Sequence, residues 1–161
     1  MKILMILDNL SCDSGVSTIV MNLYNKFDKN KMKIDFLIFK ESNTSYINIV
    51  REKGSEVFCL KNPLDFKQSL VAILELKNFF KKNAKNYDIV HLHSPTLNEF
   101  TLRYAKKYGI RNRIIHSHST MMSSNKLKNI LHKILLRNVN KYANNYWACS
   151  SCEFLIWKKI L

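Results

Sequence analysis

Residues 111–120 read Arg-Asn-Arg-Ile-Ile-His-Ser-His-Ser-Thr, and this stretch decides the fold that we expect. It is a short apolar run that stops at a cluster of polar, ionisable side chains. Residues 87–95, Tyr-Asp-Ile-Val-His-Leu-His-Ser-Pro, have the same form and also end in His-x-His-Ser. Short apolar runs separated by helical patterns are typical of a parallel sheet that is covered on both faces. Because such sheets bind ligands at the carboxyl ends of their strands, the two histidine-rich ends predict a site.

Outward from these two stretches, strand-like and helix-like segments alternate along the whole chain. The strand candidates are residues 2–7, 32–39, 56–60, 88–92, 113–116 and 146–149. The helix candidates are residues 16–27, 44–53, 66–82, 97–107, 125–142 and 151–161. The alternation predicts an α/β fold with a doubly wound, mostly parallel, Rossmann-like sheet of six or seven strands and right-handed crossovers.

The length, composition and net charge of the chain limit the number of domains and the kinds of partner that we expect. A chain of 161 residues fits one domain, and a hydrophobic fraction of 47% excludes a disordered chain. The formal net charge of +14 favours anionic partners, namely a membrane surface, nucleic acid or a phosphorylated substrate. The basic residues are scattered over the expected helices, without the interleaved aromatic residues of a single-strand nucleic-acid binder. We therefore expect no nucleic-acid partner.

The cysteines and the apolar segments indicate the compartment. The four cysteines, at positions 12, 59, 149 and 152, show no disulfide framework. Cys149-x-x-Cys152 has no second pair at zinc spacing, so we interpret both cysteines as structural. The apolar run at the N-terminus stops at Asp8, which is too short for the core of a signal peptide. No stretch approaches the ~20 apolar residues of a membrane span, and the expected localisation is cytoplasmic.

Each His-x-His pair has two possible interpretations: a metal site, or the lining of a polar cleft. Alternation along a strand places both histidines of a pair on the same side. Zinc sites usually recruit carboxylates or cysteines as further ligands, and neither pair has an acidic neighbour at ligand spacing, so we expect no metal. We expect His93 and His118 to line a cleft and to hydrogen-bond a substrate. His91 and His116, deeper in their strands, are interpreted as satisfied histidines in or near the core.

The first strand is followed by a turn that contains Gly15, which then opens a helix. Free N–H groups and the helix dipole make such a turn a natural site for an anion. The alternative, that Gly15 only eases a tight turn, stays open at this point. The turn lacks the G-x-G-x-x-G pattern, which argues against a dinucleotide-binding dehydrogenase.

An ordered set of residues resembles the N-terminal domain of a family-4 glycosyltransferase with the GT-B fold, of the bacterial capsule and exopolysaccharide type. The set consists of residues 1–6, 14–17, 21–23, 87–94, 114–120 and 148–150. The resemblance implies transfer of a sugar from a nucleotide-sugar donor to an acceptor, with retention of configuration and without an essential metal or other cofactor.

The resemblance also implies roles for individual residues. His118 is the implied catalytic residue, facing the cleft near the transferred sugar. The implied substrate-binding residues are Ser14, Gly15, Val16, His93, Ser94, Ser119 and Ser150. Ser14 replaces the first glycine of a pair that is common in the family, which weakens the implied contact between this loop and the donor diphosphate.

The family uses a second Rossmann-like domain for the nucleotide, and nothing after Ser150 can supply one. We therefore expect residues 1–161 to be a single acceptor-side domain, inactive alone, with the donor bound largely by the second domain. The expected acceptor is a glycan or a lipid-linked acceptor. The basic helix expected at 125–142 has two interpretations, which stay open at this point: peripheral contact with the anionic inner face of a membrane, or a solvated basic face on a helix that packs against the core. The alternative function is a non-catalytic binding or anchoring subunit of a split glycosyltransferase.

Overall fold

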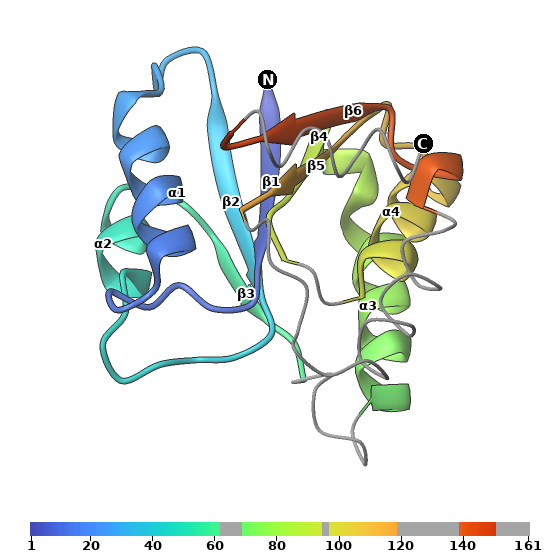
Figure 1. Ribbon diagram of the computed structural model, residues 1–161, viewed down its shortest axis with the longest axis horizontal. Coiled ribbons are helices and arrows are strands. Elements are labelled where there is room, and N and C mark those ends of the chain that lie inside the picture. Colours follow the sequence, from blue (N-terminus) through green and yellow to red (C-terminus); the bar gives the residue numbers. More distant parts are fainter. Residues whose placement is uncertain (62–68, 95–96, 119–138, 151–161) are drawn as a thin grey trace.

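A computed structural model of the protein describes residues 1–61, 69–94, 97–118 and 139–150. These residues form a six-stranded sheet in the order β3-β2-β1-β4-β5-β6, and every neighbouring pair is parallel (Figure 1). The strands are β1 (Lys2–Leu7), β2 (Lys33–Ile38), β3 (Val57–Cys59), β4 (Ile89–Leu92), β5 (Asn112–Ser117) and β6 (Asn145–Ala148). All six predicted strands are present, and the predicted doubly wound α/β fold is confirmed.

Four of the predicted helices lie within the described residues. They are α1 (Gly15–Lys26), α2 (Ile47–Glu52), α3 (Ser69–Asn83) and α4 (Asn98–Lys107). Two 3-10 helices, η1 (Ala84–Asn86) and η2 (Val139–Lys141), precede β4 and β6. Helix α2 begins three residues later than predicted. The predicted helix at 151–161, and residues 125–138 of the one at 125–142, lie outside the described residues.

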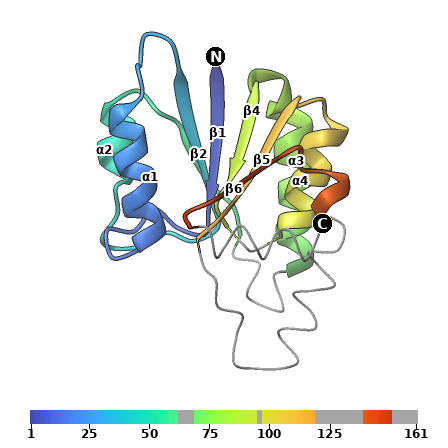
Figure 2. The ribbon, with the colours of Figure 1, turned by 45° about the horizontal axis from the view of Figure 1, so that its top comes forward.

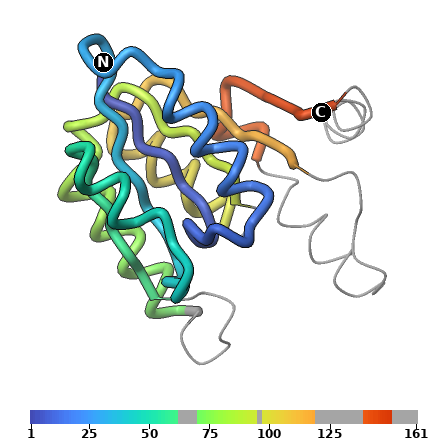
Figure 3. The backbone as a smooth tube through the Cα atoms, turned by 90° about the vertical axis from the view of Figure 1, so that its left-hand side faces the viewer, coloured from blue at the N-terminus to red at the C-terminus, as the bar shows by residue number. Residues whose placement is uncertain are grey.

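The sheet separates two hydrophobic layers. Helices α1 and α2 lie on one face and α3 and α4 on the other (Figure 1). Alternate residues of β1 supply the two layers: Ile3, Met5 and Leu7 belong to the α1 side, whereas Leu4 and Ile6 belong to the α3 side. Figure 3 follows the chain from the teal β3 region at one side to the red β6 region at the other. The continuous apolar runs of the sequence therefore reflect burial on both faces of the sheet.

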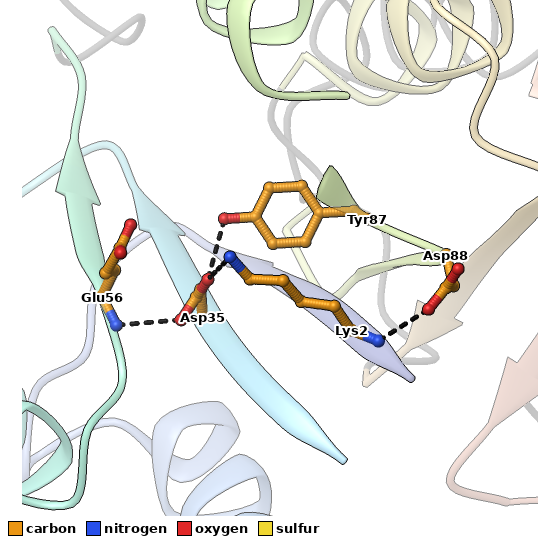
Figure 4. Close-up of polar contacts among 5 residues, drawn as sticks. All are labelled: Lys2, Asp35, Glu56, Tyr87 and Asp88. Carbon is orange, nitrogen blue, oxygen red and sulfur yellow. Dashed lines mark hydrogen bonds and ion pairs between the residues drawn. The ribbon is translucent and has the colours of Figure 1, made fainter. Parts of the chain in front are cut away.

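A buried carboxylate connects several strands near the amino end of the sheet. Asp35, in β2, is fully buried. It accepts hydrogen bonds from the Tyr87 hydroxyl at 3.0 Å and from the Glu56 backbone N–H at 2.9 Å, and its Oδ2 lies 2.9 Å from Lys2 Nζ (Figure 4). The Lys2 backbone N–H in turn donates to Asp88 Oδ2 at 2.7 Å. These contacts join β1, β2, β3 and the start of β4.

The carboxyl ends of the strands share the opposite edge of the sheet. In Figure 2 the strands β1, β4 and β5 run toward this edge, and α1 begins beside it. The segments that follow β1, β4, β5 and β6 therefore meet where parallel sheets bind ligands. Within the described part of the chain, no helix combines the length and the apolar character that crossing a bilayer requires.

Candidate functional site

Four histidines form a stack at the ends of β4 and β5, which are neighbours in the sheet. As predicted, the two histidines of each strand lie on the same side: the ring centroids are 4.0 Å apart for His91 and His93, and 4.3 Å apart for His116 and His118. Across the strands, His91 stacks on His116 at 5.3 Å and His93 on His118 at 5.1 Å. The stack lies on the α1 side of the sheet, because Ile89, two residues before His91, packs against the α1 layer.

Hydrogen bonds pair the histidines across the two strands. His91 Nε2 lies 3.2 Å from His116 Nδ1, and His93 Nδ1 lies 2.8 Å from His118 Nε2. Each bond needs one protonated and one unprotonated nitrogen, so the tautomers of the two rings in a pair are linked. The pairs therefore fix which nitrogen of His116 and of His118 points outward.

Burial keeps the deeper rings neutral. Burial, with smaller contributions from the neighbouring His116 and His118, lowers the pKa of His91 to about 3. The pKa of His93 is also well below its usual value, mainly through burial. Burial and His118 lower the pKa of His116 to about 4. At neutral pH these three rings are neutral and can accept as well as donate hydrogen bonds.

The exposure of the rings differs from the sequence-based expectation. We expected His93 and His118 to line the cleft, with His91 and His116 deeper. Instead the division follows the strands: His91 and His93 of β4 are 4% and 3% exposed, whereas His116 and His118 of β5 are half-buried. β4 lies nearer the middle of the sheet than β5, which explains why its ring positions are better covered.

Cys149, directly after β6, completes the cluster. Its Sγ lies 3.4 Å from His116 Nε2 and 3.2 Å from His118 Nδ1, and its side chain is exposed. We interpreted this cysteine as structural and expected no metal, because zinc sites usually recruit carboxylates or cysteines and neither His-x-His pair has an acidic neighbour at ligand spacing. The structure removes that reason, because the pairing of β5 with β6 brings the thiol to both rings.

A second group of polar residues joins the ends of β1 and β4. The Ser94 hydroxyl donates a hydrogen bond to Asp8 Oδ1, and Ser94 is almost fully buried. Ser94 was predicted to bind substrate, whereas no role was assigned to Asp8. Beyond it, Leu97 adopts a left-handed backbone conformation with φ of 54° just before α4. Such strain at the mouth of a strand is common at functional sites and left no signal in the sequence.

Several hydrogen bonds hold the loop before α1 in place. Ser14 is the N-cap of α1, and its hydroxyl accepts a hydrogen bond from the Ser17 backbone N–H at 3.4 Å. Asp13 Oδ2 accepts a bond from the Thr44 hydroxyl at 2.5 Å, and the Ser17 hydroxyl donates to the Asn9 carbonyl at 3.0 Å. The loop therefore presents the first N–H groups of α1 in a fixed arrangement at the carboxyl edge of the sheet.

Gly15 is the first residue of α1, and two explanations for it were open. Its φ lies outside the left-handed region, unlike that of Gly54 or Gly109, so the turn does not require glycine. A Cβ built at Gly15 would meet nothing within 4 Å. Neither the backbone conformation nor the described protein atoms around this position therefore require a glycine here.

The remaining predicted residues are placed as follows. Val16 is the second residue of α1 and is half-buried. Ser150 is exposed and follows Cys149 at the end of β6. Ser119 lies outside the described residues. The structure thus gathers the histidines, Cys149 and Ser150 at β4, β5 and β6, and Ser14 to Val16 at the same edge beside β1.

Comparisons with known proteins bear on the family and the fold of this chain. The family model for Glycosyltransferase Family 4 matches residues 14–153. EpsF of Bacillus subtilis (strain 168), which is described as a glycosyltransferase, is 32% identical over 111 residues, or 66% of this chain and 27% of EpsF. The apo structure of the lipopolysaccharide outer core galactosyltransferase WaaB superposes with a TM-score of 0.66 at 18% identity, over 99% of this chain and 42% of WaaB. The chain thus spans less than half the length of either protein, and its fold corresponds to half of the GT-B structure.

Proposed function

Because the chain belongs to glycosyltransferase family 4, we propose that it forms the acceptor-side part of an enzyme that transfers a sugar, with retention, from a nucleotide-sugar donor to a glycan or lipid-linked acceptor. The sequence resemblance to capsule and exopolysaccharide enzymes supports cell-surface polysaccharide synthesis as the pathway. A second α/β domain, in the same polypeptide or in a partner, binds the nucleotide and closes the cleft.

The single observation that supports this proposal most is that one edge of the sheet carries both the open N-terminus of α1 and the half-exposed His118. A transferase of this kind must hold a diphosphate and a sugar at the same time. Helix N-termini bind phosphate through unpaired N–H groups, which we assign to Gly15 and Val16. Imidazoles bind sugar hydroxyls through directional hydrogen bonds, which we assign to His118.

The contacts of His118 suggest which of its atoms meets the sugar. Its Nε2 faces the buried His93, whereas its Nδ1 faces the exposed side, toward Cys149. We assign Nδ1 to a hydrogen bond with a sugar hydroxyl, or with charge that develops as the donor bond breaks. His93 is then a positioning residue, because it orients the ring of His118 and does not itself reach the substrate. No nucleophilic role is assigned to His118.

The test is kinetic and uses the chain together with its donor-binding domain. His118→Ala should lower kcat by about 10²–10³, the effect of removing one hydrogen bond that strengthens in the transition state. The same change leaves buried His93 without a partner, which costs about 1–3 kcal/mol of stability. His118→Gln keeps a side-chain amide that can hydrogen-bond to His93. This variant should therefore fold normally and still have a lowered kcat. A near-normal kcat in folded His118→Ala would refute the role of His118.

A further inference from the structure

Three potential metal ligands meet at the outer end of the histidine stack. They are Cys149 Sγ, His116 Nε2 and His118 Nδ1, and one ligand atom from each residue lies within 4.8 Å of those of the other two. In a tetrahedral zinc site, Zn–S bonds of about 2.3 Å and Zn–N bonds of about 2.0–2.1 Å separate sulfur and nitrogen by about 3.6 Å. The observed separations of 3.2 and 3.4 Å need only a few tenths of an ångström to reach that geometry.

The rings behind these ligands are arranged as metal sites require. A histidine that binds a metal through one nitrogen almost always donates a hydrogen bond from the other. His116 Nδ1 can donate to His91 Nε2, and His118 Nε2 can donate to His93 Nδ1. Both bonds then leave the nitrogen that faces Cys149 with its lone pair available. A buried partner can therefore hold each candidate ring in the tautomer that binds a metal.

We propose that His116, His118 and Cys149 form a binding site for a divalent ion of the zinc class. The thiol of Cys149 loses its proton to solvent when the ion binds, and the thiolate and two neutral imidazoles supply three bonds. The exposed position of Cys149 gives the ion a path in and leaves a fourth position for water or another ligand. Sulfur and imidazole nitrogen suit Zn²⁺ and Co²⁺, whereas Mg²⁺ and Ca²⁺ require oxygen ligands.

Binding of the ion can be measured directly, without an assay of the transfer reaction. Because His118 Nδ1 would be a metal ligand, a bound ion and a sugar would compete for the same nitrogen. Zinc bound at this site would therefore compete with the sugar and would not serve as a cofactor.

The experiment titrates Co²⁺ into the reduced, metal-free chain and records the absorption spectrum. We expect one Co²⁺ per chain, a thiolate-to-cobalt charge-transfer band in the near ultraviolet, and intense visible bands typical of four-coordinate cobalt. Zn²⁺ should remove these bands by displacement, and excess Mg²⁺ should leave them unchanged. Cys149→Ser should abolish the charge-transfer band, whereas Cys59→Ser, at another exposed free cysteine, should retain it.

Histidine variants separate this site from a simple cysteine chelate. His116→Ala and His118→Ala should each weaken Co²⁺ binding at least about tenfold, since each removes one bond. His91→Phe keeps an aromatic ring in the stack but removes the hydrogen bond to His116, so it should weaken binding by about 10–100-fold while the charge-transfer band persists. Circular dichroism checks that each variant is folded.

Two results would overturn the proposal. The first is the lack of a charge-transfer band at saturating Co²⁺ in the folded, reduced chain. The second is a band that depends on Cys149 and Cys152 but survives both His116→Ala and His118→Ala, which would indicate chelation by the two cysteines alone.

Discussion

Asp35 shows how a single charged residue can be held inside a sheet. A buried carboxylate is costly unless several donors surround it. Asp35 has three, from Tyr87, Lys2 and the Glu56 backbone, and each comes from a different segment of the chain (Figure 4). Removing one donor leaves the carboxylate charge incompletely neutralised, and the two remaining donors come from other strands or their ends. The change should therefore destabilise more than one strand.

Tyr87→Phe tests this group of contacts and its dependence on pH. The substitution removes a hydrogen bond to a charged acceptor and should lower the free energy of unfolding by about 1.5–3 kcal/mol at pH 7. Burial and Asp35 raise the pKa of Tyr87 above its usual 10.0. The contribution of Tyr87 is therefore complete below about pH 10 and is lost as the pH rises further, because the unfolded phenol then ionises and the folded one does not.

The measurement is urea unfolding of both proteins between pH 7 and pH 11. The difference in stability between wild type and Tyr87→Phe should be constant up to about pH 10 and should shrink above it. Tyr108→Phe, another tyrosine that borders the α3-side core, controls for the loss of a phenol in general. A difference that grows with pH would show that the hydroxyl of Tyr87 is not held by Asp35.

The predictability of these residues from the sequence follows the range of the interactions. The histidine pairs were predictable because alternation within one strand fixes which side chains share a face. The approach of Cys149 to His116 was not, because it depends on which strands are neighbours and on the register of β5 with β6. The hydrogen bond between Tyr87 and Asp35 was not predicted for the same reason, because the two residues are 52 positions apart in the sequence.

Helices and strands were predictable because they depend on patterns that are local in the sequence. Continuous apolar runs identified all six strands, because a sheet buried on both faces requires such runs. The ends were less certain: α2 begins at Ile47 because Ser11 and Ser45 form an isolated bridge just before it. Its end before Gly54 was predicted correctly, and the φ of 86° at that residue shows why glycine stands there.

Helix α1 gives a prediction at the scale of the element. Gly15→Ala should leave the melting temperature unchanged or slightly higher, because the position has no left-handed φ, open space surrounds its Cβ, and alanine favours the helix by up to about 1 kcal/mol. In the enzyme with its donor-binding domain, the same change should raise the KM for the nucleotide sugar, since the methyl group occupies the space that we assign to the diphosphate.

Gly109→Ala is the matched control. Gly109 follows α4 with φ of 96°, a conformation that alanine adopts only under strain. This variant should lose about 1–3 kcal/mol of stability and keep its KM. If Gly15→Ala were folded and had an unchanged KM, the donor would not approach α1 at this residue.

The net charge of +14 gives the first prediction for the whole molecule. Lysine and arginine near an anionic bilayer contribute about 1 kcal/mol each, and salt screens this attraction within about 10 Å at 0.1 M and about 3 Å at 1 M. We expect the protein to co-sediment with vesicles rich in anionic lipid at low salt, to be released at high salt, and to ignore vesicles of neutral lipid. Failure to bind anionic vesicles at low salt would exclude an anchoring role for this chain.

The second prediction for the whole molecule concerns turnover. Residues 1–161 alone should transfer no sugar from any nucleotide sugar. Holding donor and acceptor together supplies about 7–11 kcal/mol of the lowering of the barrier, and we propose that a second domain makes most of the donor contacts. A transfer assay with and without that domain measures this directly. Robust turnover by 1–161 alone would show that the chain does not need a second domain.

The two-layered core has a consequence for how the protein is synthesised. Every buried member of the α1-side layer lies between residues 3 and 50, whereas the α3-side layer extends from Leu4 to Ala143. A ribosome releases the N-terminus first, so the first layer can form while the second still lacks most of its partners. At ~5–20 residues per second, the roughly 90 residues between Val50 and Ala143 take about 5–20 seconds to emerge. Until the later members of this layer emerge, beginning with Leu76, the side chains of Leu4, Ile6 and Leu37 are only partly covered on the nascent chain, and we expect a ribosome-associated chaperone to bind this incomplete sheet.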